Sequence, residues 1–291
     1  MFYIHNADAV KIVIFKTTVY TKILRDNQPM VNIVPITKSQ FLDRKWSALD
    51  NYKFAEEYAT ATLALGEISQ GMRSFPIGFV KNDNYFTLVA ILGLQPGENL
   101  FINKKGEWIP GYRPAVLRSY PFSLIPGAND QVLLAFDEDS LSYSNVAPTN
   151  LFYDENGEIV DEISRILSFL GEVHTSYSKT LQICEIINNY NLFEKWDISI
   201  TRGNKVVQVD GIYKIDENKL HALDGDALKE LQNVSGLGMI YGHIFSGSHI
   251  SLLEKLANFR DTTANSEQAN IESVEELFSY EDEDTIDFSS L

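Results

Sequence analysis

Apolar residues in the first half of this chain fall into short runs separated by turns. From residue 31 to residue 140, β-branched and aromatic runs alternate with turns built on Gly, Pro and Asn, which is typical of strands. The runs at 77–81 and 85–94 flank Asn82-Asp83-Asn84 and predict a hairpin. Within the second run, apolar residues occupy consecutive positions, as in strands that are covered on both faces.

Two later stretches have the 3.6-residue apolar period of helices. They are residues 161–190 and residues 237–259, and Gly242 and Gly247 permit a close crossing or a kink in the second. Between them, residues 197–215 predict another hairpin. The pattern therefore predicts an α+β fold, in which one mixed or antiparallel sheet from residues 31–140 and 197–215 packs against two long helices.

The two ends of the chain differ from this central domain, which we place at residues 31–260. Residues 1–29 are interpreted either as an added edge strand or as an extension upstream of a natural start at Met30. Residues 261–291 contain ten Asp or Glu and no Lys or Arg. This composition predicts a disordered acidic tail.

Charge and composition narrow the function classes. The net charge is −16, of which −10 lies in residues 261–291, and this argues against nucleic acid as a partner, because phosphate binding needs clustered Lys and Arg. A single cysteine, Cys184, excludes an internal disulfide and a Cys-based zinc site. No apolar run reaches the ~18 residues of a membrane span. The start lacks a basic signal-peptide region, which predicts a cytoplasmic protein and leaves surface association by a signal-independent route open.

The sequence contains no complete catalytic motif, and we predict no cofactor. The best candidate for a ligand site comprises polar residues beside an apolar, Gly- and Pro-rich stretch: Glu98, Asn99, Arg113, Arg118 and Tyr120. A half-buried guanidinium needs a carboxylate or a carbonyl group, and Glu98 is the candidate partner of both arginines. The cluster reads either as a structural ion pair or as a site for an anionic or carbonyl group.

A weaker candidate follows the predicted strand at 131–137. Asp137 and Asp139 stand where a strand ends, which is a common place for a cation or for an acid/base pair. Consecutive strand residues point to opposite faces, and no Ca²⁺-loop spacing accompanies these two carboxylates. A solvated strand terminus is the simpler interpretation, and no metal site is predicted.

Several long motifs resemble the SapC family of bacterial proteins, over about residues 31–259 and in the family's order. The motifs are Phe-Pro-Ile-Gly-Phe-Val at 75–80, Leu-Gln-Pro-Gly-Glu-Asn-Leu-Phe at 94–101, Gly-Tyr-Arg-Pro-Ala-Val-Leu-Arg-Ser-Tyr-Pro-Phe at 111–122 and Tyr-Gly-His-Ile-Phe-Ser at 241–246. Residues 1–29 and the acidic tail are departures from the family's pattern. The resemblance supplies no catalytic residues.

The resemblance implies association with a surface-layer system, and it leaves three hypotheses. The first is a non-catalytic binding or accessory protein of surface assembly with a protein partner. The acidic tail would then be a partner-docking or a solubilising segment, and deletion of residues 261–291 is expected to abolish partner capture without changing melting. The second is an enzyme or enzyme subunit that uses Glu98, Arg113 and Arg118. The third is a structural component of a layer or particle, for which a homo-oligomer stays open.

Overall fold

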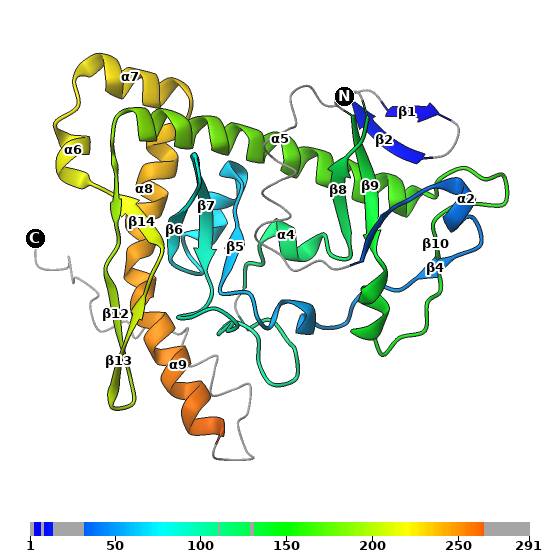
Figure 1. Cartoon of the computed structure of the whole chain (residues 1–291), viewed down its shortest axis with the longest axis horizontal. Coiled ribbons are helices and arrows are strands. Elements are labelled where there is room, and N and C mark those ends of the chain that lie inside the picture. Colours follow the sequence, from blue (N-terminus) through cyan, green and yellow to red (C-terminus); the bar gives the residue numbers. More distant parts are fainter. Residues whose placement is uncertain (1–2, 7–8, 14–31, 110, 129–130, 265–291) are drawn as a thin grey trace, which may run out of the picture.

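The computed structural model describes residues 3–6, 9–13, 32–109, 111–128 and 131–264. In these residues the fold is α+β, as predicted, and every strand pairing is antiparallel. No helix in these ranges is long and apolar enough to cross a membrane. Figure 1 shows strands gathered in two places along the molecule, with a long helix passing over both.

The first of two five-stranded sheets, sheet I, is centred on β9 (Gln131–Asp137). Strand β8 (Phe122–Pro126) pairs with one side of β9, and β3 (Ile33–Pro35) pairs with the other. Strand β2 (Ala9–Val13) pairs with the same side of β9 as β3 does, but nearer the start of β9. It forms a hairpin with β1 (Tyr3–Asn6). The described N-terminal residues are therefore strands of sheet I, and residues 14–29 lie outside the described ranges.

The second, sheet II, has the order β11-β14-β6-β7-β5. Its centre is the predicted hairpin of β6 (Ile77–Asn82) and β7 (Tyr85–Ile91), whose side chains are largely buried. The outer strands are β5 (Thr60–Thr62), β11 (Phe193–Lys195) and β14 (Ile212–Ile215). Two short pairs stand apart: β4 (Lys45–Trp46) with β10 (Asn150–Leu151), and β12 (Ile198–Arg202) with β13 (Lys205–Val209).

The prediction of one sheet was therefore wrong. Between β7 and β8 the chain runs from residue 92 to residue 121 through a series of turns and one short helix, and this stretch contains four prolines. Proline cannot donate to a ladder, so the second group of strands forms a sheet of its own. Residues 198–209, expected in the same sheet, form the separate β12–β13 hairpin, and only β14 joins β6.

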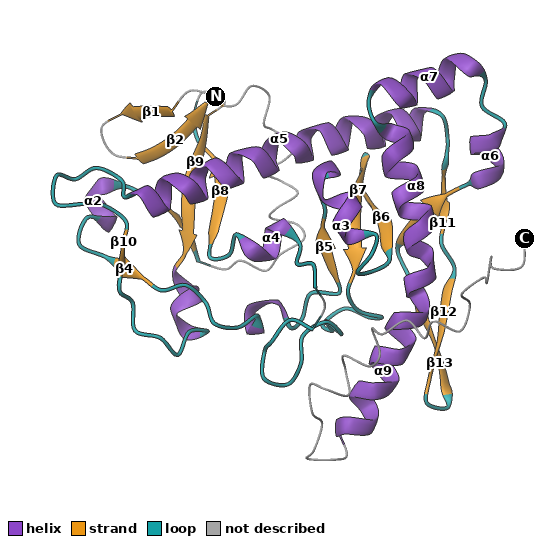
Figure 2. Cartoon of the chain, turned by 180° about the vertical axis from the view of Figure 1, so that it is seen from behind, coloured by secondary structure: helices purple, strands orange, loops and turns teal. Residues whose placement is uncertain are grey.

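Helix α5 (Asp161–Asn189) corresponds to the first predicted long helix and passes over both sheets (Figures 1 and 2). Its first half contributes Ile163 and Leu167 to the apolar core of sheet I. Its second half contributes Ile183 and Ile187 to the core of sheet II. One helix thus forms a wall of both cores.

The second predicted long helix is divided. Helix α8 (Gly236–Ser246) is followed by a 3-10 turn (Gly247–His249) and then by α9 (Ile250–Ala264). The break falls at Gly247, one of the two glycines for which a kink was foreseen. Helix α9 also continues beyond Arg260, so the first residues assigned to the tail are helical, and residues 265–291 lie outside the described chain.

Shorter helices complete the fold. They are α2 (Lys38–Phe41), α3 (Ile68–Gly71), α4 (Ala115–Arg118), α6 (Glu217–His221) and α7 (Gly225–Asn233), with 3-10 turns at Lys53–Ala55, Leu65–Glu67 and Glu138–Ser142. The Asp216 and Asp224 side chains accept hydrogen bonds from the first turns of α6 and α7. Such caps satisfy amides that a helix N-terminus leaves unpaired.

Candidate functional site

Glu98 lies with a different arginine from the two that the sequence suggested. Its Oε1 accepts a 2.8 Å hydrogen bond from Nη1 of Arg202, at the end of β12. The same guanidinium binds the carboxylate of Asp261 through Nε and Nη2, at 2.7 and 2.8 Å. Glu98 is 8% exposed, so this ion pair ties the Gln95–Glu98 turn to the β12–β13 hairpin and to α9. The deletion of residues 261–291 would therefore also remove Asp261, which binds Arg202.

The side chain of Asn99 is hydrogen-bonded to backbone groups of the fold. Its side chain is fully buried, the amide donates to the carbonyl of Ala55 at 3.0 Å, and its Oδ1 accepts from the amide of Phe101 at 3.0 Å. The backbone carbonyls of Asn99 and Ile102 both accept hydrogen bonds from Arg260, at 2.6 Å. These contacts fix the turn between β7 and the loop that follows it.

Arg113 and Arg118 lie on the surface, each against an aromatic ring. Nη1 of Arg113 donates to the hydroxyl of Tyr52 at 2.6 Å, and its guanidinium carbon lies 5.6 Å from the centre of that ring. The guanidinium of Arg118 lies 5.6 Å from the ring of Tyr112 and 5.1 Å from that of Phe169, a residue of α5. We call this set, Tyr52, Tyr112, Arg113, Arg118 and Phe169, the arginine–aromatic surface.

A backbone contact holds the two arginines in one arrangement. Nε of Arg118 donates to the carbonyl of Arg113 at 2.9 Å, across the single turn of α4. Cation–π contacts of this kind contribute about 0.5–1 kcal/mol each at exposed sites. The two exposed cations are therefore held in place by contacts within the chain.

Tyr120 and Asp137 form a pair of their own. The Tyr120 hydroxyl donates to Oδ2 of Asp137 at 2.9 Å, and its ring stacks on Phe54 with centroids 3.9 Å apart. The other oxygen of Asp137 accepts from the backbone amide of Asp139. Burial raises the pKa of Asp137 despite these two hydrogen bonds. Asp139 is exposed, and no group of three or more metal-ligand side chains occurs in the described ranges.

Sequence reasoning missed Glu67, which is 7% exposed. Its carboxylate accepts from the backbone amides of Ala64 and Ala115, at 2.8 and 2.6 Å, and from the Tyr112 hydroxyl at 2.8 Å. Burial raises the pKa of Glu67, and these donors oppose that shift. The only available signal was one acidic residue in the apolar run 61–68. Glu67 braces Tyr112 and α4 from inside, and thereby supports the arginine–aromatic surface.

The buried His243 lies on α8 beside sheet II. Its Nδ1 is 2.7 Å from the carbonyl of Ile77, and its Nε2 accepts from the amide of Ile215 at 3.2 Å. This pattern requires the neutral ring with the proton on Nδ1. Burial lowers the pKa of His243 from 6.5 to about 4.

His243 should make stability depend on pH. Between pH 6.5 and about 4 the unfolded chain binds a proton that the folded chain excludes, so the free energy of unfolding falls as pH falls, by up to about 3 kcal/mol. Denaturant titrations at several pH values in this window give the free energy of unfolding as a function of pH. Compared with the native chain, this dependence on pH should be shallower for His243→Asn and unchanged for His221→Asn, a substitution at an exposed site. The raised pKa of Glu67 makes the free energy of unfolding rise as pH falls, but this contribution is the same in the native chain and in both variants. Equal slopes for both variants would contradict the assignment.

Comparison with known proteins gives one finding. No curated protein and no solved structure matches this chain. The family model of SapC matches residues 36–253, which include both sheets apart from the β1–β2 hairpin and β3, the full length of α5 and the arginine–aromatic surface. On that match, this chain belongs to the SapC family.

Proposed function

We propose that this SapC-family chain is a non-catalytic accessory protein that binds a protein partner in a surface-layer or surface-assembly system. The observation that carries the proposal is the arginine–aromatic surface. Arg, Tyr and Trp are the residues most enriched where binding energy concentrates in protein interfaces. Here two exposed arginines are held against aromatic rings, so little side-chain entropy is lost when a partner binds.

The other residues of the sequence-derived cluster support binding over reaction chemistry. Glu98 is paired with Arg202, Asn99 holds backbone groups, and Tyr120 donates to Asp137. Each of these three side chains thus makes a contact that joins segments of the fold. Arg113 and Arg118 also bond within the fold, but both are exposed, and their remaining N–H groups suit a partner that offers carboxylate or carbonyl groups.

The test is retention of a partner by the immobilised full-length chain. Detergent-free extracts of surface-layer material are passed over the native chain, Arg113→Ala and Arg118→Ala, with Arg165→Ala on α5 as an exposed control. A truncation that costs about 2 kcal/mol or more, as at an interface hot spot, weakens retention more than tenfold. We expect this loss for Arg113→Ala and Arg118→Ala and full retention for Arg165→Ala.

Two results would count against the proposal. One is capture that both arginine variants retain at native strength while their melting temperatures stay unchanged. The other is turnover of a substrate by the native chain that either variant abolishes, which would favour the enzyme hypothesis.

A further inference from the structure

The C-terminal end of α9 is held between two turns from distant parts of the chain. On one side, the carboxylate of Asp261 binds Arg202 through two hydrogen bonds, and the side chain of Asn258 accepts from the amide of Gly203. On the other side, Arg260 donates to the carbonyls of Asn99 and Ile102. The point from which residues 265–291 leave the helix is therefore fixed relative to both turns.

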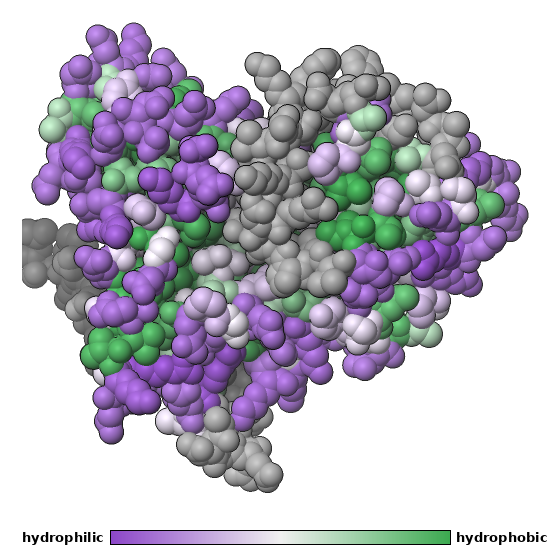
Figure 3. Space-filling view, viewed as in Figure 1, coloured by the Kyte–Doolittle hydropathy of each residue, from purple (hydrophilic) through white to green (hydrophobic). Residues whose placement is uncertain are grey.

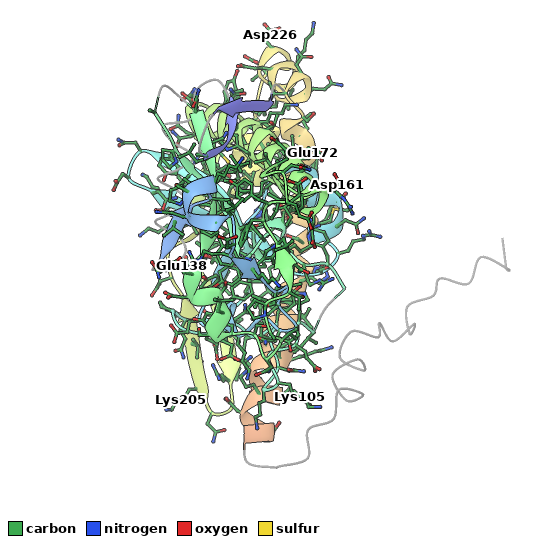
Figure 4. All side chains as sticks on the ribbon, turned by 90° about the vertical axis from the view of Figure 1, so that its right-hand side faces the viewer. Lys105, Glu138, Asp161, Glu172, Lys205 and Asp226 are labelled. Atoms are coloured by element: carbon green, nitrogen blue, oxygen red, sulfur yellow. The ribbon has the colours of Figure 1, made fainter. Side chains whose placement is uncertain are left out.

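Both turns carry lysines on their outer side. Lys105 belongs to the turn that follows Ile102, and Lys205 begins β13 directly after the Arg202–Asn204 turn; both are exposed. Figure 4 shows Lys105 and Lys205 at the end of the molecule where α9 finishes, opposite Asp226 on α7. Glu107, whose carboxylate accepts from the amide of Asn103, is the acidic residue of the first turn.

The β12–β13 hairpin also carries an exposed apolar residue. Val206, next to Lys205 on β13, is 67% exposed, and Figure 3 shows hydrophobic residues over this hairpin. We call Lys105, Lys205 and Val206, which lie on or next to the two turns that hold the end of α9, the basic end face. It offers positive charge and an apolar contact at the site from which the chain continues.

The continuing segment has the complementary composition. Residues 265–291 contain nine Asp or Glu and no Lys or Arg, with apolar residues between the acidic ones: Ile271, Val274, Leu277 and Phe278. Asp261, the last acidic residue of α9 before this segment, binds Arg202 of the same hairpin. The hairpin thus already binds one carboxylate from the helix that leads into this segment.

We propose that residues 265–291 dock in cis on the basic end face. Each exposed ion pair alone is weak, but a short tether raises the effective concentration of the segment to about millimolar, and several weak contacts then act together. Salt weakens the contact, because the Debye length falls from about 8 Å at 0.15 M to about 3 Å at 1 M. The inference does not depend on the proposed function, which uses a different surface.

A spin label in the segment tests this in the full-length chain. Cys184 is buried, so Ser279→Cys provides the reactive thiol for labelling. At low salt we expect a slow component in the label's spectrum that is lost at about 1 M salt and lost in Lys105→Glu/Lys205→Glu. The control Lys179→Glu/Lys229→Glu makes the same charge change at exposed positions on α5 and α7, and it should keep the slow component.

Three outcomes would overturn the proposal. The first is equal label mobility in the native chain and in the Lys105→Glu/Lys205→Glu variant. The second is a slow component that disappears on dilution, which would assign the contact to a second copy of the chain. The third is an equal loss in the control variant, which would reduce the effect to net charge. None of these three outcomes affects the partner-capture test with Arg113→Ala, which probes a different surface.

Discussion

Replacing Arg202 by Met is expected to lower the free energy of unfolding by about 3 kcal/mol, because removing one partner of a buried ion pair leaves the other charge uncompensated. Glu98 is that charge: it is 8% exposed, and Arg202 is its ion-pair partner. Methionine keeps most of the apolar stem, so the loss reports on the guanidinium. Urea titration of the native chain and of Arg202→Met measures the difference.

Two further variants separate the contributions. Asp261→Asn removes the exposed member of the group and should cost less than about 1 kcal/mol, as for other surface pairs. Glu98→Gln/Arg202→Met removes both buried charges and should recover much of the loss. If Arg202→Met and Asp261→Asn cost the same, Glu98 is not the residue that makes Arg202 important.

The second large effect is expected for Gly242→Ala on α8. A Cβ at this position would lie 2.2 Å from Cγ2 of Ile68, a buried, β-branched side chain with little freedom to move. Overpacking of this kind costs about 1–3 kcal/mol. Thermal and urea unfolding of the variant should both show the loss.

Gly238→Ala, one turn earlier on the same helix, is the matched control. Apart from the helix's own backbone and the neighbouring residues, no atom lies within 4 Å of its added Cβ, and alanine is favoured over glycine in helices by up to about 1 kcal/mol. The same substitution should therefore stabilise the protein at 238 and destabilise it at 242. Equal effects at both positions would mean that α8 does not approach α3 as closely as the structure has it.

Local patterns in the sequence predicted the elements that depend on local chemistry. The apolar period of residues 161–190 gave α5, and the Asn82-Asp83-Asn84 turn between two apolar runs gave the β6–β7 hairpin. The apolar run at 131–137 gave β9. In each case the side-chain period and the turn residues suffice to define the element.

Contacts between distant segments could not be predicted in this way. Glu98 and Arg202 are 104 residues apart, and no pattern near either residue indicates that β12 ends beside the Gln95–Glu98 turn. The division into two sheets likewise depends on where the Pro-rich stretch 92–121 directs the chain. Glu67 appeared as one acidic residue in an apolar run. One of its three donors, Ala64, is three residues away, but the other two, Tyr112 and Ala115, come from within that Pro-rich stretch.

Helix α5 also determines how the two halves respond to damage. Because the same helix supplies Ile163 to one core and Ile187 to the other, neither half can melt without withdrawing apolar side chains from its neighbour. We therefore expect the two sheets to unfold as one cooperative unit. A destabilising substitution in either sheet then lowers the free energy of unfolding of the entire described chain.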